Sequence, residues 1–139
     1  MRSVRRRRLG WLAVTLAIVV AAGCGPGKPT LVPISGRVTL NGKPLHLGSV
    51  QFVAQGVRPA YGQIDKDGFF SLETDGEPGC PIGQHKVLVQ AQEISGTEAT
   101  GEKMKQISPL KYASLEGTDL VVDVTEPKRD VRIELKSSP

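Results

Sequence analysis

The chain has 139 residues, a length that fits one domain with a single core. Basic residues outnumber acidic ones by 18 to 14, but five arginines lie within residues 1–8, so from Cys24 onward 13 basic residues face 14 acidic ones. We therefore expect no nucleic-acid partner, because the folded part lacks a basic excess. Two histidines and two cysteines exclude a site that needs many imidazole or thiolate ligands.

Residues 1–24 have the three parts of an export signal. The basic run Met1–Arg8 precedes an apolar run of 14 residues, Leu9–Ala22, and small residues follow. As a helix this run would be about 21 Å long, shorter than the ~30 Å hydrocarbon core of a bilayer. The glycines and prolines that follow disfavour a longer helix. We therefore expect a cleaved signal segment over residues 1–23 rather than a permanent transmembrane anchor.

The sequence Ala21-Ala22-Gly23-Cys24 resembles a bacterial lipobox. The resemblance implies cleavage after Gly23, a diacylglycerol on the sulfur of Cys24 and an amide-linked acyl chain such as palmitate. Ala21 departs from the larger aliphatic residue that is usual there, and an ordinary secretory signal that happens to precede a cysteine is the alternative. By resemblance to enterobacterial sorting, Gly25 favours the outer membrane, with the periplasmic or surface face left open.

Residues 24–33 are rich in glycine and proline, which disfavour helix and central strand. They are predicted to form a tether that holds the domain, residues 34–136, off the membrane. The domain shows short alternating segments and no helical stripe. Asn41-Gly42 and Asp65-Lys66-Asp67-Gly68 read as turns between strands. Strands are predicted over residues 34–40, 49–54, 60–64, 69–74, 84–92, 118–125 and 130–136.

These segments predict an all-β domain, a seven-stranded antiparallel β-sandwich. Residues 65–68 are expected to close one hairpin, and residues 126–129 are expected to join the last two strands in another. Residues 93–109 read as an irregular polar loop that is mobile or covers a sheet edge.

The succession Ile34–Leu45, Gly48–Phe52 and Asp65–Phe69 is similar to the transthyretin-like or carboxypeptidase-regulatory-like domain. The continuation Pro81–Val89 and the dipeptide Lys111-Tyr112 resemble its short lipoprotein version in planctomycete-type bacteria. The resemblance covers about residues 33–136 and implies a prealbumin-like Greek-key sandwich. Its motifs are turn and core positions, so they concern the fold and say little about activity. His85 stands where the family has tyrosine, which implies a looser sheet corner.

Few residues could carry chemistry. Asp65–Gly68 lacks the further oxygen ligands of a calcium loop, and a hairpin turn is the preferred interpretation. His46 is expected to be solvated and His85 to be a hydrogen-bonded, partly buried ring, with no metal or other cofactor. Cys80 has no partner for an intramolecular disulfide once Cys24 is lipidated. His85 is the sole nearby candidate base, but nothing in the sequence fixes the two residues at a shared site and no oxyanion-hole motif accompanies them. An inert or adventitiously reactive thiol is therefore expected, with an intermolecular disulfide or a catalytic nucleophile as the alternatives.

The aromatic residues are the remaining candidates. Tyr61, Phe69 and Tyr112 form a possible contact surface, and Phe69 is favoured because it must point away from the face that Phe70 takes. The expected function is a non-enzymatic binding or structural module of the cell envelope, anchored by lipid, with an unknown envelope protein or glycan as partner. The alternatives are a carbohydrate- or peptide-binding lipoprotein with its site on residues 93–117 and, remotely, a hydrolase of the transthyretin fold. The hydroxyisourate hydrolases of that fold carry more histidines and a different carboxy terminus.

Overall fold

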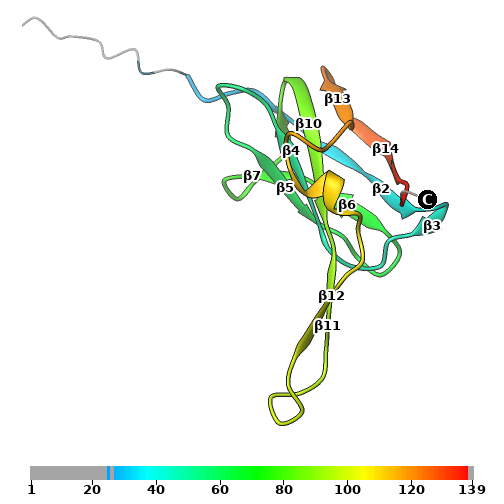
Figure 1. Ribbon diagram of the computed structural model, residues 1–139. Coiled ribbons are helices and arrows are strands. Elements are labelled where there is room, and N and C mark those ends of the chain that lie inside the picture. Colours follow the sequence, from blue (N-terminus) through cyan, green and yellow to red (C-terminus); the bar gives the residue numbers. More distant parts are fainter. Residues whose placement is uncertain (1–24, 26, 138–139) are drawn as a thin grey trace, which may run out of the picture.

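Strands make up most of the regular structure in the computed structural model, which describes Gly25 and residues 27–137 (Figure 1). The predicted cleavage and lipidation residues, Gly23 and Cys24, lie outside the described residues. Within the described part, the one helical element is the short 3-10 helix η1 (Leu110–Ala113). The strands are, in chain order, β1 (Leu31–Val32), β2 (Ile34–Leu40), β3 (Lys43–Pro44), β4 (Ser49–Val53), β5 (Ala60–Gln63), β6 (Phe69–Ser71), β7 (Glu73–Thr74), β8 (Glu77–Pro78), β9 (Cys80–Pro81), β10 (Gly83–Gln90), β11 (Gln92–Ser95), β12 (Lys103–Gln106), β13 (Val121–Val124) and β14 (Lys128–Leu135).

The larger sheet has the strand order β13-β10-β4-β5-β7-β8, and its neighbouring strands are antiparallel. β10 pairs with β4 so that Val87 lies opposite Phe52 and Val89 lies opposite Val50. All four of these side chains are buried. Because successive side chains point to opposite faces of a strand, this sheet has one apolar face and one exposed face.

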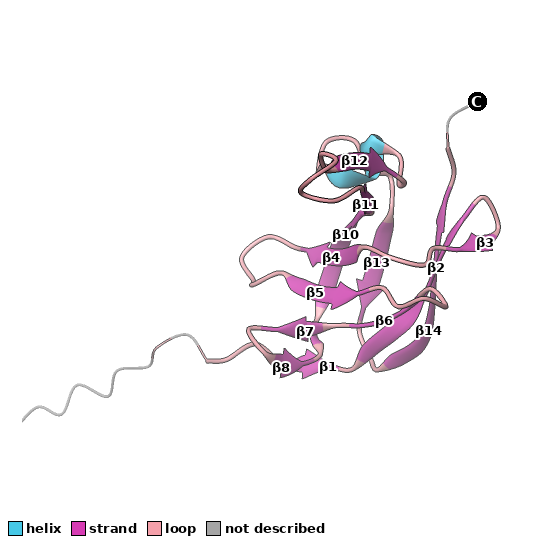
Figure 2. Ribbon diagram, turned by 90° about the horizontal axis from the view of Figure 1, so that it is seen from below, coloured by secondary structure: helices cyan, strands magenta, loops and turns pink. Residues whose placement is uncertain are grey.

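The smaller sheet has the order β14-β2-β3, and β6 also pairs with β2. β14 runs parallel to β2, with Ile133 opposite Val38, so the expectation of an entirely antiparallel fold is wrong. Figure 2 shows β10, β4 and β5 in one layer and β2 and β14 in another. The prediction of an all-β domain is confirmed in the part of the chain that the structure describes. The described residues form fourteen strands rather than seven. The count is higher because several two-residue strands flank the turns and because the strand expected over residues 69–74 is divided in two.

The last two strands do not form the expected hairpin. β13 is an edge strand of the larger sheet, whereas β14 belongs to the smaller one. Residues 125–127 carry the chain between the sheets, and the N–H of Lys128 then donates to the carbonyl of Pro33 (3.0 Å). Val124 and Val131 are both buried. Alternation predicts only which face is apolar, so it cannot distinguish a hairpin from a crossing to the opposite layer.

The strand predicted over residues 69–74 is divided in the same way. β6 pairs with β2, but β7 pairs with β5 in the larger sheet. Leu72 lies between them, buried, and its N–H donates to the carbonyl of Ile34 (2.9 Å). The turn at residues 65–68 is confirmed, but the strand after it joins the other layer.

Residues 93–109, expected to be irregular, contain a hairpin. β11 and β12 pair antiparallel with Ile94 opposite Met104, and the hairpin projects from the body of the domain in Figure 1. The two side chains are 63% and 68% exposed. Neither strand has a buried face, so the segment lacks the apolar alternation that predicted the other strands.

The tether predicted over residues 24–33 ends before Pro33. The carbonyl of Thr30 accepts a hydrogen bond from the N–H of Ile82 (3.3 Å), and β1 then pairs with β9. Lys28 forms an exposed ion pair with Glu77 (3.2 Å). The segment from Thr30 onward is therefore part of the fold.

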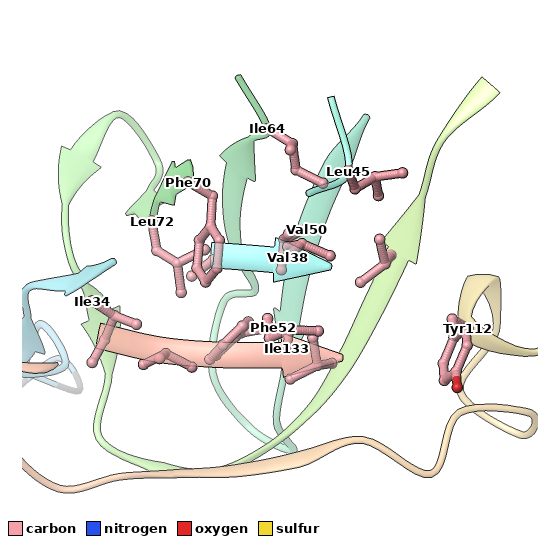
Figure 3. Packing of buried hydrophobic residues seen from close by; sticks show 14 of the residues in the cluster. Ile34, Val38, Leu45, Val50, Phe52, Ile64, Phe70, Leu72, Tyr112 and Ile133 are labelled. Carbon is pink, nitrogen blue, oxygen red and sulfur yellow. The ribbon is translucent and has the colours of Figure 1, made fainter. Parts of the chain in front are cut away.

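Side chains from both sheets fill one core (Figure 3). Val38 and Ile133 of the smaller sheet join Val50 and Phe52 of the larger one, and the centroids of the Phe52 and Phe70 rings are 6.3 Å apart. Each fully buried aliphatic or aromatic side chain of this kind contributes about 1.5–3 kcal/mol to folding. The core holds the two sheets face to face, and the outer face of each sheet is exposed.

Candidate functional site

The turn at Asp65 sets the direction of the next two side chains. One carboxylate oxygen of Asp65, Oδ1, accepts hydrogen bonds from the N–H groups of Asp67 (2.8 Å) and Phe69 (2.9 Å), and Gly68 has φ +85°. This geometry confirms the turn interpretation. Phe69 then points outward, 47% exposed, and Phe70 points into the core, 3% exposed. The prediction that they face opposite sides is confirmed.

Phe69 belongs to a row of side chains across three strands. On β2, Arg37 lies opposite Arg132 of β14 on one side and opposite Phe69 of β6 on the other. The neighbours of Arg37 on β2, Gly36 and Val38, are buried, so Arg37 points to the outer face. Its guanidinium carbon, Cζ, lies over the Phe69 ring, 4.2 Å from the centroid. This is cation–π contact distance.

A shallow groove of about 570 Å³ runs over this row. Arg132 is ion-paired with Asp130 (Nη2 to Oδ2, 3.5 Å), and Thr39 lies opposite Glu134 in the next row. Among residues 27–137, no carboxylate lies within ion-pair distance of Arg37. We call this surface the arginine–phenylalanine face; it is lined by Arg37, Thr39, Gly42, Phe69, Asp130, Arg132 and Glu134.

The other two predicted contact residues lie elsewhere. Tyr61 is 50% exposed, but it belongs to β5 of the larger sheet, where its hydroxyl accepts a hydrogen bond from Nε2 of Gln51 (3.0 Å). Tyr112 is 2% exposed, and its hydroxyl accepts a hydrogen bond from the N–H of Lys136 (3.1 Å). Figure 3 shows its ring at one end of the core. The prediction of Tyr112 as a contact residue is wrong, because η1 turns the side chain inward.

Cys80 and His85 are brought together, contrary to expectation. Both are fully buried, and Sγ of Cys80 lies 3.6 Å from Nε2 of His85. Nδ1 of His85 lies 3.0 Å from the carbonyl oxygen of Gly83, which can only accept, so Nδ1 carries the proton and Nε2 can accept from the thiol. Burial raises the pKa of Cys80 to about 12. A neutral, buried thiol is a poor nucleophile, and this supports the expected inert role.

Sequence reasoning missed a second groove, of about 650 Å³, at one edge of the larger sheet. Its exposed apolar residues come from distant segments: Ile82 precedes β10, Leu115 follows η1, and Val121 begins β13. Lys86 donates from Nζ to the carbonyl of Leu115 (2.8 Å) and so holds that segment over the groove. The only sequence signal for this groove is a set of aliphatic residues scattered along the chain. The sequence does not show which of them become neighbours in the fold.

The remaining candidates form no cluster. His46 is exposed, as predicted, on the segment that leads into β4. Within residues 27–137, no three side chains among histidine, cysteine, aspartate and glutamate come together in a way that could hold a metal ion. No helix in this part of the chain is long and apolar enough to cross a membrane.

Comparisons with known proteins do not assign a family. No protein-family model matches the chain, and no curated protein matches it. Among solved structures, the chain is similar to the crystal structure of a 9R-lipoxygenase from Cyanothece PCC8801, with 15% identity and a TM-score of 0.39. The alignment covers 77% of this chain and 16% of the lipoxygenase chain. Likeness at this level establishes neither the fold nor the function of the chain.

Proposed function

We propose that this chain is an exported, lipid-anchored binding domain of the cell envelope, without enzymatic activity. Cys24 carries the lipid, residues 25–29 form the tether, and the domain is a transthyretin-like Greek-key sandwich. Its ligand binds to the arginine–phenylalanine face rather than to residues 93–117. The lipobox-like sequence before Cys24 and the two-layer all-β core support the anchor and the fold type.

One observation carries the binding role. Phe69 is half-exposed in regular structure, and the guanidinium of Arg37 lies over its ring at 4.2 Å. Arginine is among the residue types that most often dominate binding energy at interfaces, and phenylalanine is enriched there. The guanidinium of Arg37, which pairs with no carboxylate of residues 27–137, is therefore the part of this surface best suited to hold a ligand.

The mass of the mature protein tests the anchor. The chain recovered from the detergent phase of its native cells should have the mass of residues 24–139 plus a diacylglycerol and an amide-linked acyl chain. The Cys24→Ser variant should lose the lipid mass. An uncleaved or unlipidated wild-type chain would contradict the proposed attachment.

Binding to the native envelope tests the ligand site. Mature chain in phospholipid nanodiscs should bind delipidated envelopes of its own cells saturably, and Arg37→Gln should weaken this binding about tenfold or more. Arg58→Gln removes the same charge from an exposed arginine that is paired with Asp75 (3.7 Å), so it serves as the matched control and should change binding less than twofold. No saturable binding, or an equal loss in both variants, would overturn the proposed site.

A further inference from the structure

We propose, on the basis of the binding function proposed above, that the arginine–phenylalanine face binds an acidic polysaccharide whose sugar rings carry carboxylates. Arg37 holds the carboxylate, Phe69 positions Arg37 and contacts the sugar ring, and the acidic residues of the groove accept hydrogen bonds from sugar hydroxyls. The geometry of the row formed by Arg132, Arg37 and Phe69 leads to this assignment.

The Phe69 ring restrains Arg37 before any ligand binds. Its guanidinium lies over the Phe69 ring at 4.2 Å, which limits the freedom of the side chain. Two N–H groups of a guanidinium can pair with the two oxygens of one carboxylate, and no hydrogen bond from the Arg37 side chain to residues 27–137 competes for them. Because the stacking restrains the side chain before binding, less side-chain entropy is lost when the ligand binds.

The charges around Arg37 favour an added negative group. Arg132 lies opposite Arg37 on the neighbouring strand, about 5 Å away along the sheet. Like charges that face each other across strands destabilise a sheet. Asp130 is paired with Arg132 (3.5 Å), whereas no carboxylate from residues 27–137 pairs with Arg37. Asp130 offsets the charge of Arg132, so Arg37 is the cation of this row that a bound anion would neutralise.

The rest of the groove favours a sugar acid over a densely charged polymer. Asp130 and Glu134 line the same groove, so its two arginines are matched by two carboxylates. Ionised carboxylates accept hydrogen bonds and repel other anions. Sugar hydroxyls can donate to them, whereas a polyphosphate has no donors and a run of glutamates has only its backbone N–H groups. A polysaccharide with one carboxylate on each sugar ring and hydroxyls around it is therefore the ligand that can use every polar group of this surface, including the hydroxyl of Thr39.

Binding to a defined polymer tests the inference. Mature full-length chain in nanodiscs is titrated with polygalacturonate and with the same polymer after complete methyl esterification, which removes the charge and keeps the sugar chain. We expect saturable binding to the acid and at least tenfold weaker binding to the ester. Poly-glutamate and polyphosphate of similar length should also bind more weakly than polygalacturonate.

Three variants and one control identify the residues. Arg37→Lys keeps the charge but loses the two-pronged geometry, and Arg37→Gln loses both, so both should weaken binding about tenfold or more. Phe69→Leu keeps an apolar side chain without an aromatic face and should weaken binding several-fold. Arg58→Gln should have less than a twofold effect. Unchanged thermal unfolding shows that each variant is folded, which is expected because Arg37, Arg58 and Phe69 are exposed.

The outcomes separate this inference from the proposed function. Arg37-dependent binding to native envelopes without binding to polygalacturonate would overturn the sugar-acid assignment and leave the proposed function standing. Equal binding of acid and ester, or tighter binding of poly-glutamate or polyphosphate, would also overturn it. If Arg37→Lys and Arg37→Gln both bind as tightly as the wild type, the sugar-acid assignment and the proposed binding site are both overturned.

Discussion

Replacing Gly68 with alanine would separate two energetic costs in the turn that places Phe69. Gly68 has φ +85°, and Gly42 in the turn after β2 has φ +82°. A Cβ on Gly42 would meet no heavy atom within 4 Å, whereas a Cβ on Gly68 would lie 2.8 Å from the carbonyl oxygen of Val38. That carbonyl accepts a hydrogen bond from the N–H of Leu45 (3.0 Å). Gly42→Ala therefore measures the backbone cost alone, and Gly68→Ala adds the contact.

The left-handed conformation costs an alanine about 1–2 kcal/mol, so Gly42→Ala should destabilise the domain by that amount. Gly68→Ala should cost a further ~1 kcal/mol, because the Val38 carbonyl must move and its hydrogen bond weakens. For a domain of this size, each kcal/mol corresponds to about 4–8 °C in Tm. The two variants should therefore differ from each other by about 5 °C.

Urea unfolding of the mature chain in detergent, followed by far-UV circular dichroism, measures both free energies of unfolding. Tryptophan fluorescence is unsuitable because the single tryptophan, Trp11, lies in the predicted signal segment. If the slope of the free energy of unfolding against urea concentration is the same in wild type and variants, their unfolded states expose comparable surface and the free energies can be compared. Equal midpoints for the two variants would refute the contact with Val38, and wild-type stability in both would refute the need for a positive φ at these positions.

Three further predictions concern buried and exposed side chains. The free energy of unfolding should fall as pH rises from about 9 toward 12, because the unfolded Cys80 thiol ionises while the folded thiol, with its pKa raised to about 12, stays protonated. When the free energy of unfolding is measured across this pH range, the Cys80→Ala variant should show a smaller fall than the wild type. An identical fall in the two proteins would contradict the raised pKa. Tyr112→Phe should cost about 1 kcal/mol in thermal unfolding, since the N–H of Lys136 loses its acceptor, and no change would show that water replaces the hydroxyl. Ile94→Ser and Met104→Ser should each change stability by less than about 0.5 kcal/mol in the same assay, because both side chains project into solvent; a larger loss would indicate that the hairpin packs against the domain.

The sequence predicted local structure well where a single strand or turn carries the signal. The alternation of Val131, Ile133 and Leu135 predicted a half-buried strand, and all three are buried in β14. Asn41-Gly42 predicted a turn, and both residues have positive φ. These features depend on residues that are adjacent in the chain, so local preferences are sufficient to predict them.

The sequence did not predict which strands become neighbours. Alternation in β13 and β14 is satisfied equally by a hairpin and by a crossing between layers, because both arrangements bury the same faces. The hairpin at residues 92–106 has no buried face, so its pairing left no apolar pattern to detect. Tyr112 was misplaced because a short 3-10 helix, which has no periodic signature, turns it into the core.

The candidate site shows the same division. By itself, the sequence determined that Phe69 and Phe70 point to opposite faces, and Phe69 is the exposed one. Only the tertiary structure decided that Arg37 lies between Arg132 and Phe69, because β2 pairs with β14 on one side and with β6 on the other. Side-chain direction follows from backbone geometry within one strand. Which strands become neighbours depends on how the apolar faces of the two sheets pack into one core, and this packing involves residues that are far apart in the sequence.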